Sequence, residues 1–194
     1  AVVTGPVTLS FLSEIKEPAY QDRKTLVQDL VQAIADECRV LGEKGVGWIQ
    51  VEEPLLLRKP DLFPLVESSL QEIARKKGSA KVVLSTYFGD AAPLYDRLLR
   101  LPVEGLGLDF AYGGSRLVER ISQRGDKVLF LGLVDGRSTR LEPVEQLLGM
   151  IKKMSLGSAD PDVFLTSSCG LEYLPRGRAR EKLDLLARCK EALS

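Results

Sequence analysis

The sequence predicts an α/β fold made of about six βα units around a parallel sheet. Two observations lead to this prediction: short β-rich apolar runs alternate with longer amphipathic runs, and polar residues follow almost every apolar run. A third observation decides between a doubly wound sheet and a barrel. No early strand is followed by the glycine-rich phosphate-binding loop that is typical of a doubly wound fold. We therefore predict a (β/α)8 barrel of the TIM type that is incomplete here, since such a barrel closes at eight units.

Six apolar runs supply the strands of the predicted sheet. Each run is short and bounded by glycine, proline or aspartate, and a helix candidate follows it. The predicted strands cover residues 1–5, 46–53, 80–88, 104–110, 127–134 and 162–168.

The clearest helix is predicted from Arg23 to Lys44, and Gly45 suits the first position beyond its end. Apolar side chains recur along it at spacings of three or four, at Leu26, Leu30, Ile34, Cys38 and Leu41. Cys189 is placed in the same way on the last predicted helix, on a face shared with Leu183, Leu186 and Leu193. Both Cys38 and Cys189 are therefore expected to be small buried residues of the core.

Composition excludes several classes of protein. The chain has 194 residues, 44% hydrophobic and 28% charged, which suits a globular domain and excludes a disordered or fibrous one. Lys and Arg number 27, as do Asp and Glu, so no overall field favours nucleic acid or an anionic membrane as a partner. No apolar run reaches the roughly 18 residues of a membrane span. Three cysteines indicate reduced thiols and a cytoplasmic setting.

Polar and charged residues gather directly after the apolar part of nearly every predicted strand. The carboxyl ends of barrel strands meet at one face, where active sites are built. Strand alternation places Gln50 and Glu52 on one face with Trp48, and Asp109 on a face with Gly107. We therefore expect two or three carboxylates to converge. The predicted substrate-binding residues are Gln50, Glu52, Glu53, Thr86, Tyr87, Asp109, Asp135, Arg137, Ser167 and Ser168.

Six of these strand-end blocks resemble, in the same order, those of the cobalamin-independent methionine synthases, whose two similar barrels arose by duplication. The resemblance is densest to the N-terminal barrel. It implies that residues 1–194 are a single partial barrel domain holding the last six of eight strands, so about two βα units are expected before Ala1. The blocks are GPVTLSFLS, WIQVEEPLL, STYFGD, LPVEGLGLDF, LGLVDGR and SSCGLEYLP, at residues 5–13, 48–56, 85–90, 101–110, 131–137 and 167–175.

The resemblance also implies a zinc ion in the family's C-terminal barrel, where it turns the homocysteine thiol into a thiolate. Its ligands there are a His and a Cys after one strand, a Glu after the next, and a Cys in a block like SSCGL. Here STYFGD supplies neither of the first two, Asp109 stands in place of the Glu, and the chain has no histidine. We therefore expect this chain alone to bind no zinc and assign it no catalytic residue. No cobalamin is expected.

Cys169 is then interpreted as a remnant of such a ligand set. The alternatives are a residue that lines the pocket, or a metal ligand completed from outside this chain. A cysteine nucleophile is disfavoured, because no histidine is available as its base.

Three further features keep two interpretations each. Glu52 and Glu53 match a block that binds the amino group of homocysteine in the catalytic barrel, or they close a strand and bond loop amides. Asp135 and Arg137 form an ion pair that fixes a loop, which we favour, or contact a ligand carboxylate. The last feature is the arginine cluster at the start of the last predicted helix, Arg176, Arg178 and Arg180. It binds an anion such as a folate polyglutamate tail, or it is a solvated helix start.

By resemblance, the chain supports methyl transfer from a 5-methyltetrahydrofolate polyglutamate to homocysteine in methionine biosynthesis. It would contribute to folate binding, while a zinc-bearing barrel, in the same polypeptide or in a partner, would carry the catalytic ligands. The alternative is a non-catalytic module that recognises a methyl carrier or a thiol for another transferase. A barrel hydrolase using Glu52 and Asp109 as an acid/base pair ranks lowest, since two carboxylates alone are a common coincidence.

Overall fold

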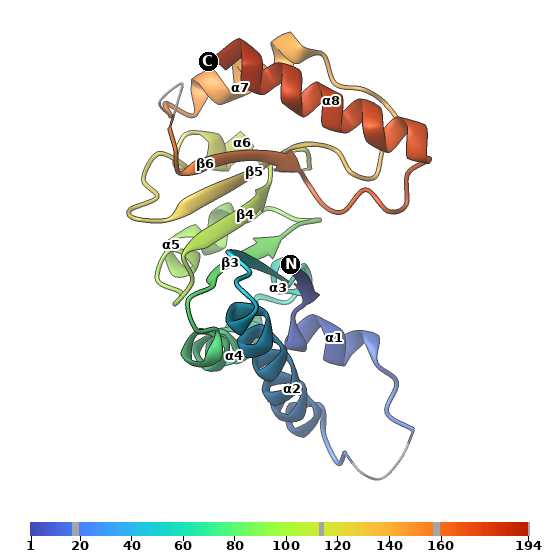
Figure 1. Cartoon of the computed structure of the whole chain (residues 1–194), viewed down its shortest axis with the longest axis vertical. Helices are drawn as coiled ribbons and strands as arrows, with labels where there is room; N and C mark the ends of the chain where they lie inside the picture. Colours follow the sequence, from blue (N-terminus) through green and yellow to red (C-terminus); the bar gives the residue numbers. More distant parts are fainter. Residues whose placement is uncertain (17–19, 113–114, 157–159, 194) are drawn as a thin grey trace. The chain divides into compact units, whose positions relative to one another are not determined.

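The computed structural model describes residues 1–16, 20–112, 115–156 and 160–193 (Figure 1). The chain divides into two compact units, one of residues 1–86 and 100–106 and the other of residues 87–99 and 107–194. In both units strands alternate with helices, which confirms the predicted α/β class.

The first unit begins with a strand and a short helix and contains two long helices. Its elements are β1 (Val2–Thr4), α1 (Pro6–Leu12), α2 (Arg23–Glu43), β2 (Trp48–Glu52), α3 (Leu55–Arg58), the 3-10 turn η1 (Pro60–Leu62), α4 (Phe63–Lys76) and β3 (Lys81–Thr86).

The second unit holds the later strands and two longer helices that follow β5 and β6. Its elements are the 3-10 turn η2 (Ala92–Leu94), α5 (Tyr95–Leu98), most of β4 (Gly105–Asp109), α6 (Ser115–Val118), β5 (Val128–Val134), α7 (Val144–Lys153), β6 (Val163–Ser167) and α8 (Arg176–Leu193).

All six predicted strands are present, and the sheet order follows the chain from β1 to β6. In the first unit β2 pairs in parallel with β1 and β3, and Val51 lies opposite both Val3 and Leu84. In the second unit β5 pairs in parallel with β6, and the Phe110 N–H just after β4 donates to the Gly132 carbonyl at 2.9 Å. Because the order is linear, β1 and β6 are edges, as expected of an incomplete barrel.

The strand β2 alternates as the sequence predicts. Ile49 and Val51 are fully buried, whereas Trp48, Gln50 and Glu52 are half-buried. The strand therefore presents one apolar face to the core and a mixed face that carries its polar groups.

The helix α2 confirms the predicted boundaries to within one residue. It ends in a Schellman motif: Gly45, with φ of 80°, donates to the Gly42 carbonyl at 3.0 Å, and the Val46 N–H donates to the Leu41 carbonyl at 3.1 Å. Cys38 is fully buried on its apolar stripe, and burial raises the pKa of its thiol to about 11. This thiol is therefore a core residue, as predicted.

The predicted apolar face of α8 is partly wrong. Cys189 is buried as expected, but Leu183 is 55% exposed, and the buried face instead carries Lys182 and Leu185. The spacing of the leucines does not indicate this face, because a lysine lies on it. Lys182 faces inward because its ammonium group has a buried partner, Glu142, described below.

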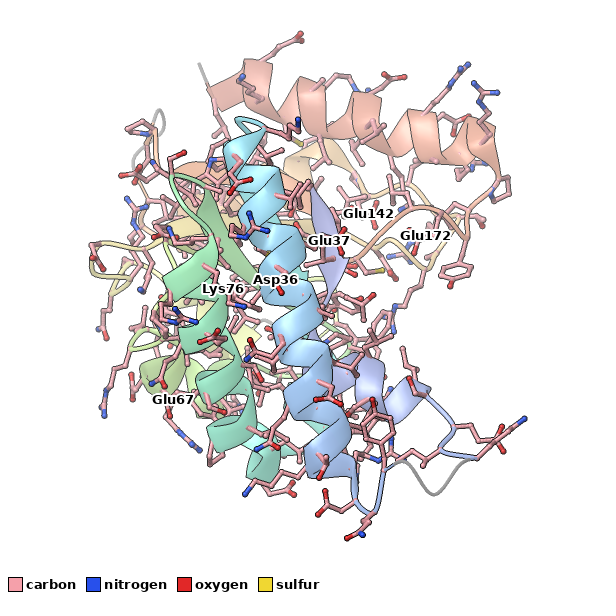
Figure 2. All side chains as sticks on the ribbon, turned by 60° about the horizontal axis from the view of Figure 1, so that its bottom comes forward. Asp36, Glu37, Glu67, Lys76, Glu142 and Glu172 are labelled. Atoms are coloured by element: carbon pink, nitrogen blue, oxygen red, sulfur yellow. The ribbon has the colours of Figure 1, made fainter. Side chains whose placement is uncertain are left out.

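The helices α2 and α4 lie side by side in the first unit (Figure 2). Lys76 of α4 reaches Asp36 of α2 at 2.9 Å and also Gln32 at 3.0 Å. Near the end of α2, a Cβ on Gly42 would lie 2.2 Å from the carbonyl oxygen of Lys77, the residue that follows α4. Glycine at position 42 therefore lets the two helices pack.

This contact predicts opposite effects for two Gly→Ala substitutions. Gly42→Ala adds a methyl group against backbone and is expected to lower the free energy of unfolding by about 1–3 kcal/mol. Gly149→Ala, inside α7 with nothing within 4 Å of the new Cβ, is expected to raise it by roughly 0.5–1 kcal/mol. Denaturant titration of both variants measures the sign of each change in the free energy of unfolding. Stabilisation by Gly42→Ala would contradict the close packing of α2 against α4.

Candidate functional site

The ends of the strands in the first unit carry Gln50, Glu52, Glu53 and Thr86. The Gln50 Nε2 donates to Glu52 Oε1 at 2.9 Å, so these two predicted residues lie together on the mixed face of β2. Thr86, at the end of β3, is buried, and its hydroxyl has no hydrogen-bond partner within the described residues.

The Glu53 carboxylate fixes the helix that follows β1. It is buried, and its two oxygens accept from the Val7 and Thr8 amides at 2.9 and 2.7 Å, in the first turn of α1. Burial raises the pKa of Glu53, although these hydrogen bonds act to lower it. A Cβ on Gly5 would lie 2.3 Å from the carboxyl carbon. The carboxylate therefore bonds backbone amides, as one of the two interpretations expected, but these amides belong to a helix rather than to a loop. Binding of substrate by Glu53 stays a prediction.

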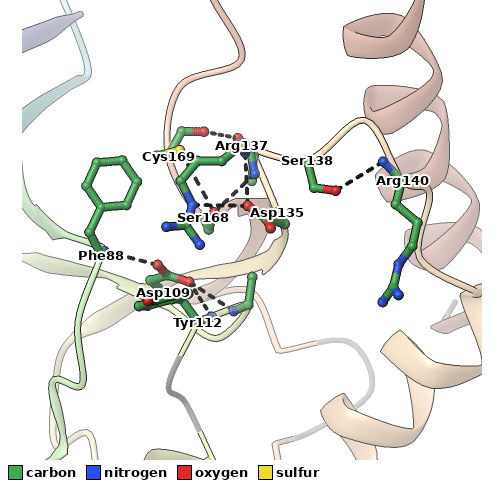
Figure 3. Close-up of polar contacts among 12 residues, drawn as sticks. Phe88, Asp109, Tyr112, Asp135, Arg137, Ser138, Arg140, Ser168 and Cys169 are labelled. Atoms are coloured by element: carbon green, nitrogen blue, oxygen red, sulfur yellow. Dashed lines mark hydrogen bonds and ion pairs between the residues drawn. The ribbon is translucent and has the colours of Figure 1, made fainter. Parts of the chain in front are cut away.

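In the second unit, the Asp109 carboxylate at the end of β4 joins the loop that carries Phe88 to the loop that carries Tyr112 (Figure 3). Its Oδ2 accepts from the Phe88 N–H at 3.1 Å, and its Oδ1 accepts from Ala111 and Tyr112 at 2.9 and 3.1 Å. Asp109 is 4% exposed, and burial raises its pKa against the opposing effect of these bonds and of Arg137. The carboxylate thus holds the backbones of Phe88 and Tyr112.

The rings of Phe88 and Tyr112 both contact the guanidinium group of Arg137. The ring centroids lie 5.0 and 4.3 Å from its central carbon, a distance at which a cation is attracted to an aromatic face. Phe88 has φ of 66°, in the left-handed region that a bulky side chain rarely adopts, so its backbone is strained. The hydrogen bond from Phe88 to Asp109 helps to hold it there. Tyr87, the predicted neighbour, packs edge-on against Phe88 at 4.6 Å.

Asp135 and Arg137 form the predicted ion pair at the end of β5. Asp135 Oδ1 accepts from both the backbone N–H and the Nε of Arg137, at 2.9 and 3.3 Å. The Asp135 N–H donates to Glu142 Oε1 at 2.9 Å. The loop between β5 and α7 is therefore closed by two carboxylates, one at each end.

Glu142 in turn pairs with Lys182 of α8. The Lys182 Nζ lies 3.1 Å from Glu142 Oε2 and donates to the Arg140 carbonyl at 2.7 Å, while the lysine side chain is fully buried. A buried ammonium needs such partners, because leaving it unpaired costs several kcal/mol. This pair ties the last helix to the loop that carries Asp135 and Arg137.

The end of β6 brings Ser167, Ser168 and Cys169 to the same loop. The Ser168 Oγ accepts from the Gly136 N–H at 3.1 Å, and the Ser167 hydroxyl donates to the Cys169 carbonyl at 2.7 Å. Cys169 is half-buried, burial raises the pKa of its thiol, and its Sγ lies 3.6 Å from the Gly170 carbonyl oxygen. A Cβ on Gly136 would come within 2.7 Å of that sulfur, so the two loops touch.

The structure thus brings Asp109, Asp135, Arg137, Ser168 and Cys169 together in the second unit (Figure 3). A family model described as "Cobalamin-independent synthase, N-terminal domain" matches residues 1–157. The chain belongs to this family. The expected family is thereby confirmed.

Curated relatives agree with this assignment. The protein named 5-methyltetrahydropteroyltriglutamate–homocysteine methyltransferase from Campylobacter jejuni subsp. doylei is 32% identical, over 99% of this chain and 27% of its own length. Its namesake from Lactococcus lactis subsp. lactis is 29% identical, over 89% of this chain and 23% of its own length. The chain therefore spans about a quarter of these relatives.

Solved structures show the same fold. A B12-independent methionine synthase from Shewanella sp. W3-18-1, in complex with selenomethionine, superposes with a TM-score of 0.81 at 17% identity, covering 99% of this chain and 61% of that one. A methyltransferase from Methanosarcina mazei gives 0.69 at 18% identity, covering 96% and 58%. The barrel-type fold class predicted from the sequence is confirmed.

The residues of the cluster do not fit the zinc ion that the family implies. Zinc prefers three or four protein ligands. Among the described residues, no group of three Cys, Asp or Glu side chains is placed to hold a metal ion. Asp109 uses both oxygens on backbone amides, and burial raises the pKa of the Cys169 thiol, which disfavours the thiolate. We derive no chemistry of this chain through zinc.

The start of α8 was predicted with two alternatives. Arg178 forms an ion pair with Glu181, which matches a solvated helix start. Arg176 and Arg180 are exposed.

None of the described helices is long and apolar enough to cross a bilayer.

Four contributors to the cluster were missed by sequence reasoning. Phe88 directly follows the predicted Tyr87, and Tyr112 lies three residues after the predicted Asp109. Their nearness in sequence to predicted site residues could have indicated them. Glu142 and Lys182 lie 40 residues apart, and only a three-dimensional contact reveals their pairing.

The buried pair leads to a prediction about stability. Lys182→Met removes the ammonium group and leaves Glu142 largely buried without its partner, so we expect the free energy of unfolding to fall by about 3 kcal/mol or more. The matched control Lys152→Met, exposed on α7, is expected to change it by less than about 0.5 kcal/mol.

The double variant Lys182→Met/Glu142→Gln tests whether the effect comes from the pair. It is expected to lose less stability than the sum of the two single variants, because neither charge is then left alone. Strict additivity in thermal or urea unfolding would contradict the pairing.

Proposed function

We propose that this chain acts as the N-terminal barrel of a cobalamin-independent methionine synthase. In this role it supports methyl transfer from a 5-methyltetrahydrofolate polyglutamate to homocysteine by binding and positioning substrate. The observation that carries the proposal is the cluster of Asp109, Asp135, Arg137 and Ser168 at the carboxyl ends of β4, β5 and β6, in a chain of this family.

The cluster supports binding rather than chemistry. Its carboxylates accept backbone amides and its cation is held by two rings, so the groups are fixed before any ligand arrives. With no histidine in the chain, the thiol of Cys169 has no imidazole base beside it. The remaining predicted residues, including Gln50, Glu52 and Tyr87, belong to the proposal as candidates for substrate contact.

The zinc ion and its ligands are proposed to belong to a second barrel, in the same polypeptide or in a partner protein. That barrel would supply the His, Cys and Glu ligands, a set that this chain lacks because it has no histidine. We further propose that the protein works in the cytoplasm and uses neither cobalamin, nucleic acid nor a membrane. The balanced charge of 27 basic and 27 acidic residues supports the exclusion of polyanionic partners.

The test is a titration of 5-methyltetrahydropteroyltriglutamate against the 194-residue chain, with zinc content measured on the same sample. We expect saturable folate binding, well under one zinc ion per chain, and no methionine formation from homocysteine. Methionine is expected only after a polypeptide that carries the missing zinc ligands is added.

Two results would contradict the proposal. Stoichiometric, tightly bound zinc in the chain alone would make Cys169 a ligand rather than a remnant. Absence of folate binding both alone and with the second barrel would favour the alternative, a family member that serves as a binding module for another transferase.

A further inference from the structure

The loop between β5 and α7 is folded around a buried ammonium group. Lys182 of α8 is fully buried, and its Nζ donates to the Arg140 carbonyl at 2.7 Å and lies 3.1 Å from Glu142 Oε2. Arg140 and Glu142 both belong to this loop, and the Glu142 side chain is only 12% exposed. One side chain of the last helix therefore holds the second half of the loop.

Glu142 connects this ammonium group to the first residue of the loop. Its Oε1 accepts from the Asp135 N–H at 2.9 Å, seven residues earlier in the chain. Asp135 Oδ1 in turn accepts from the backbone N–H and the Nε of Arg137, at 2.9 and 3.3 Å (Figure 3). A continuous series of polar contacts thus leads from α8 to the guanidinium group of Arg137.

The other contacts of the loop leave the direction of this guanidinium group open. A cation–π contact acts within about 6 Å of a ring centroid, so the rings of Phe88 and Tyr112 tolerate some movement of the cation over them. The bond from the Gly136 N–H to Ser168 Oγ, at 3.1 Å, fixes the loop against β6 but holds neither Asp135 nor Arg137 by its side chain. Direction comes from Asp135, because a hydrogen bond weakens steeply when its angle changes.

Stability alone does not account for a lysine at buried position 182. Replacing a buried ion pair by apolar residues of similar volume is often neutral or stabilising, because desolvation of the two charges offsets much of their attraction. An apolar side chain would fill the same space, but it would not donate to Arg140 or orient the carboxylate of Glu142. What the ion pair adds is the direction in which this carboxylate points.

We propose that Lys182 and Glu142 are positioning residues for Arg137. Lys182 fixes the carboxylate of Glu142, which holds the Asp135 amide and, through the Asp135 side chain, the guanidinium group at the strand ends. In this role neither Lys182 nor Glu142 contacts a ligand. The use of Arg137 in binding substrate rests on the proposed function, whereas its positioning rests on the contacts above.

The experiment compares two double variants that both remove the ion pair and differ only at position 142. Lys182→Met/Glu142→Gln keeps a side-chain oxygen that accepts from the Asp135 N–H, whereas Lys182→Met/Glu142→Met keeps a similar volume without that acceptor. Two quantities are measured in chains that unfold cooperatively: the hydrogen-exchange rate of the Asp135 amide and the NMR shifts of the Arg137 side-chain protons.

We expect the Met/Met variant to exchange the Asp135 amide about tenfold faster than the wild type or more, because its hydrogen bond is lost. Its Arg137 resonances are expected to move toward those of an exposed arginine. The Met/Gln variant is expected to restore the wild-type behaviour of both. The single variant Lys182→Met, where it folds, is expected to resemble Met/Met, because the unpaired carboxylate of Glu142 turns toward water.

The surface control is Lys152→Met on α7, which is expected to leave both measurements as in the wild type. The inference is overturned if the folded Met/Met variant keeps the exchange rate and the Arg137 shifts of the wild type. It is also overturned if Met/Gln loses both as fully as Met/Met, since an acceptor at position 142 would then have no effect.

Titration of 5-methyltetrahydropteroyltriglutamate against the same samples separates this inference from the proposed function. We expect Met/Met to bind it about fivefold more weakly than Met/Gln. Equal affinity of the two double variants overturns the positioning role. The expected NMR effects without folate binding by the wild type, alone or with the second barrel, overturn the proposed function and leave the positioning of Arg137 standing.

Discussion

The buried carboxylate of Asp109 is the interaction on which the candidate site depends. It accepts three backbone amides from two loops, and those loops carry the two rings that contact Arg137. Both loops leave from the carboxyl ends of strands, since Phe88 follows β3 and Tyr112 follows β4. A side chain with fewer acceptors at position 109 could not hold both loops.

Two features of the site lower the stability of the fold, and neighbouring interactions offset this cost. Burial raises the pKa of Asp109, and the backbone of Phe88 is strained, so both cost stability. The hydrogen bonds to Asp109, the contacts of the rings with Arg137 and the buried Glu142–Lys182 pair oppose these costs. Such a fixed, strained and charged cluster is typical of a place that binds ligands rather than of ordinary core.

Much of the fold followed from the sequence because its signals are local. The six strands were found from β-rich runs with clear boundaries, and α2 from its apolar period and terminal Gly45. The site was found only in part. Strand-end position indicated Asp109, Asp135 and Arg137, but the inward orientation of Lys182 and the resulting exposure of Leu183 depend on a partner 40 residues away. Likewise, the two amides that occupy Glu53 belong to α1, 45 and 46 residues earlier.

The most direct test of this account measures the NMR shifts of the Arg137 side-chain protons in the wild type and in Asp109→Asn. Ring currents from Phe88 and Tyr112 are expected to move these resonances upfield in the wild type. In Asp109→Asn, which keeps the shape but loses acceptors, they are expected to return toward the values of an exposed arginine while the chain stays folded. Unchanged upfield shifts in the folded variant would show that Asp109 does not organise the site.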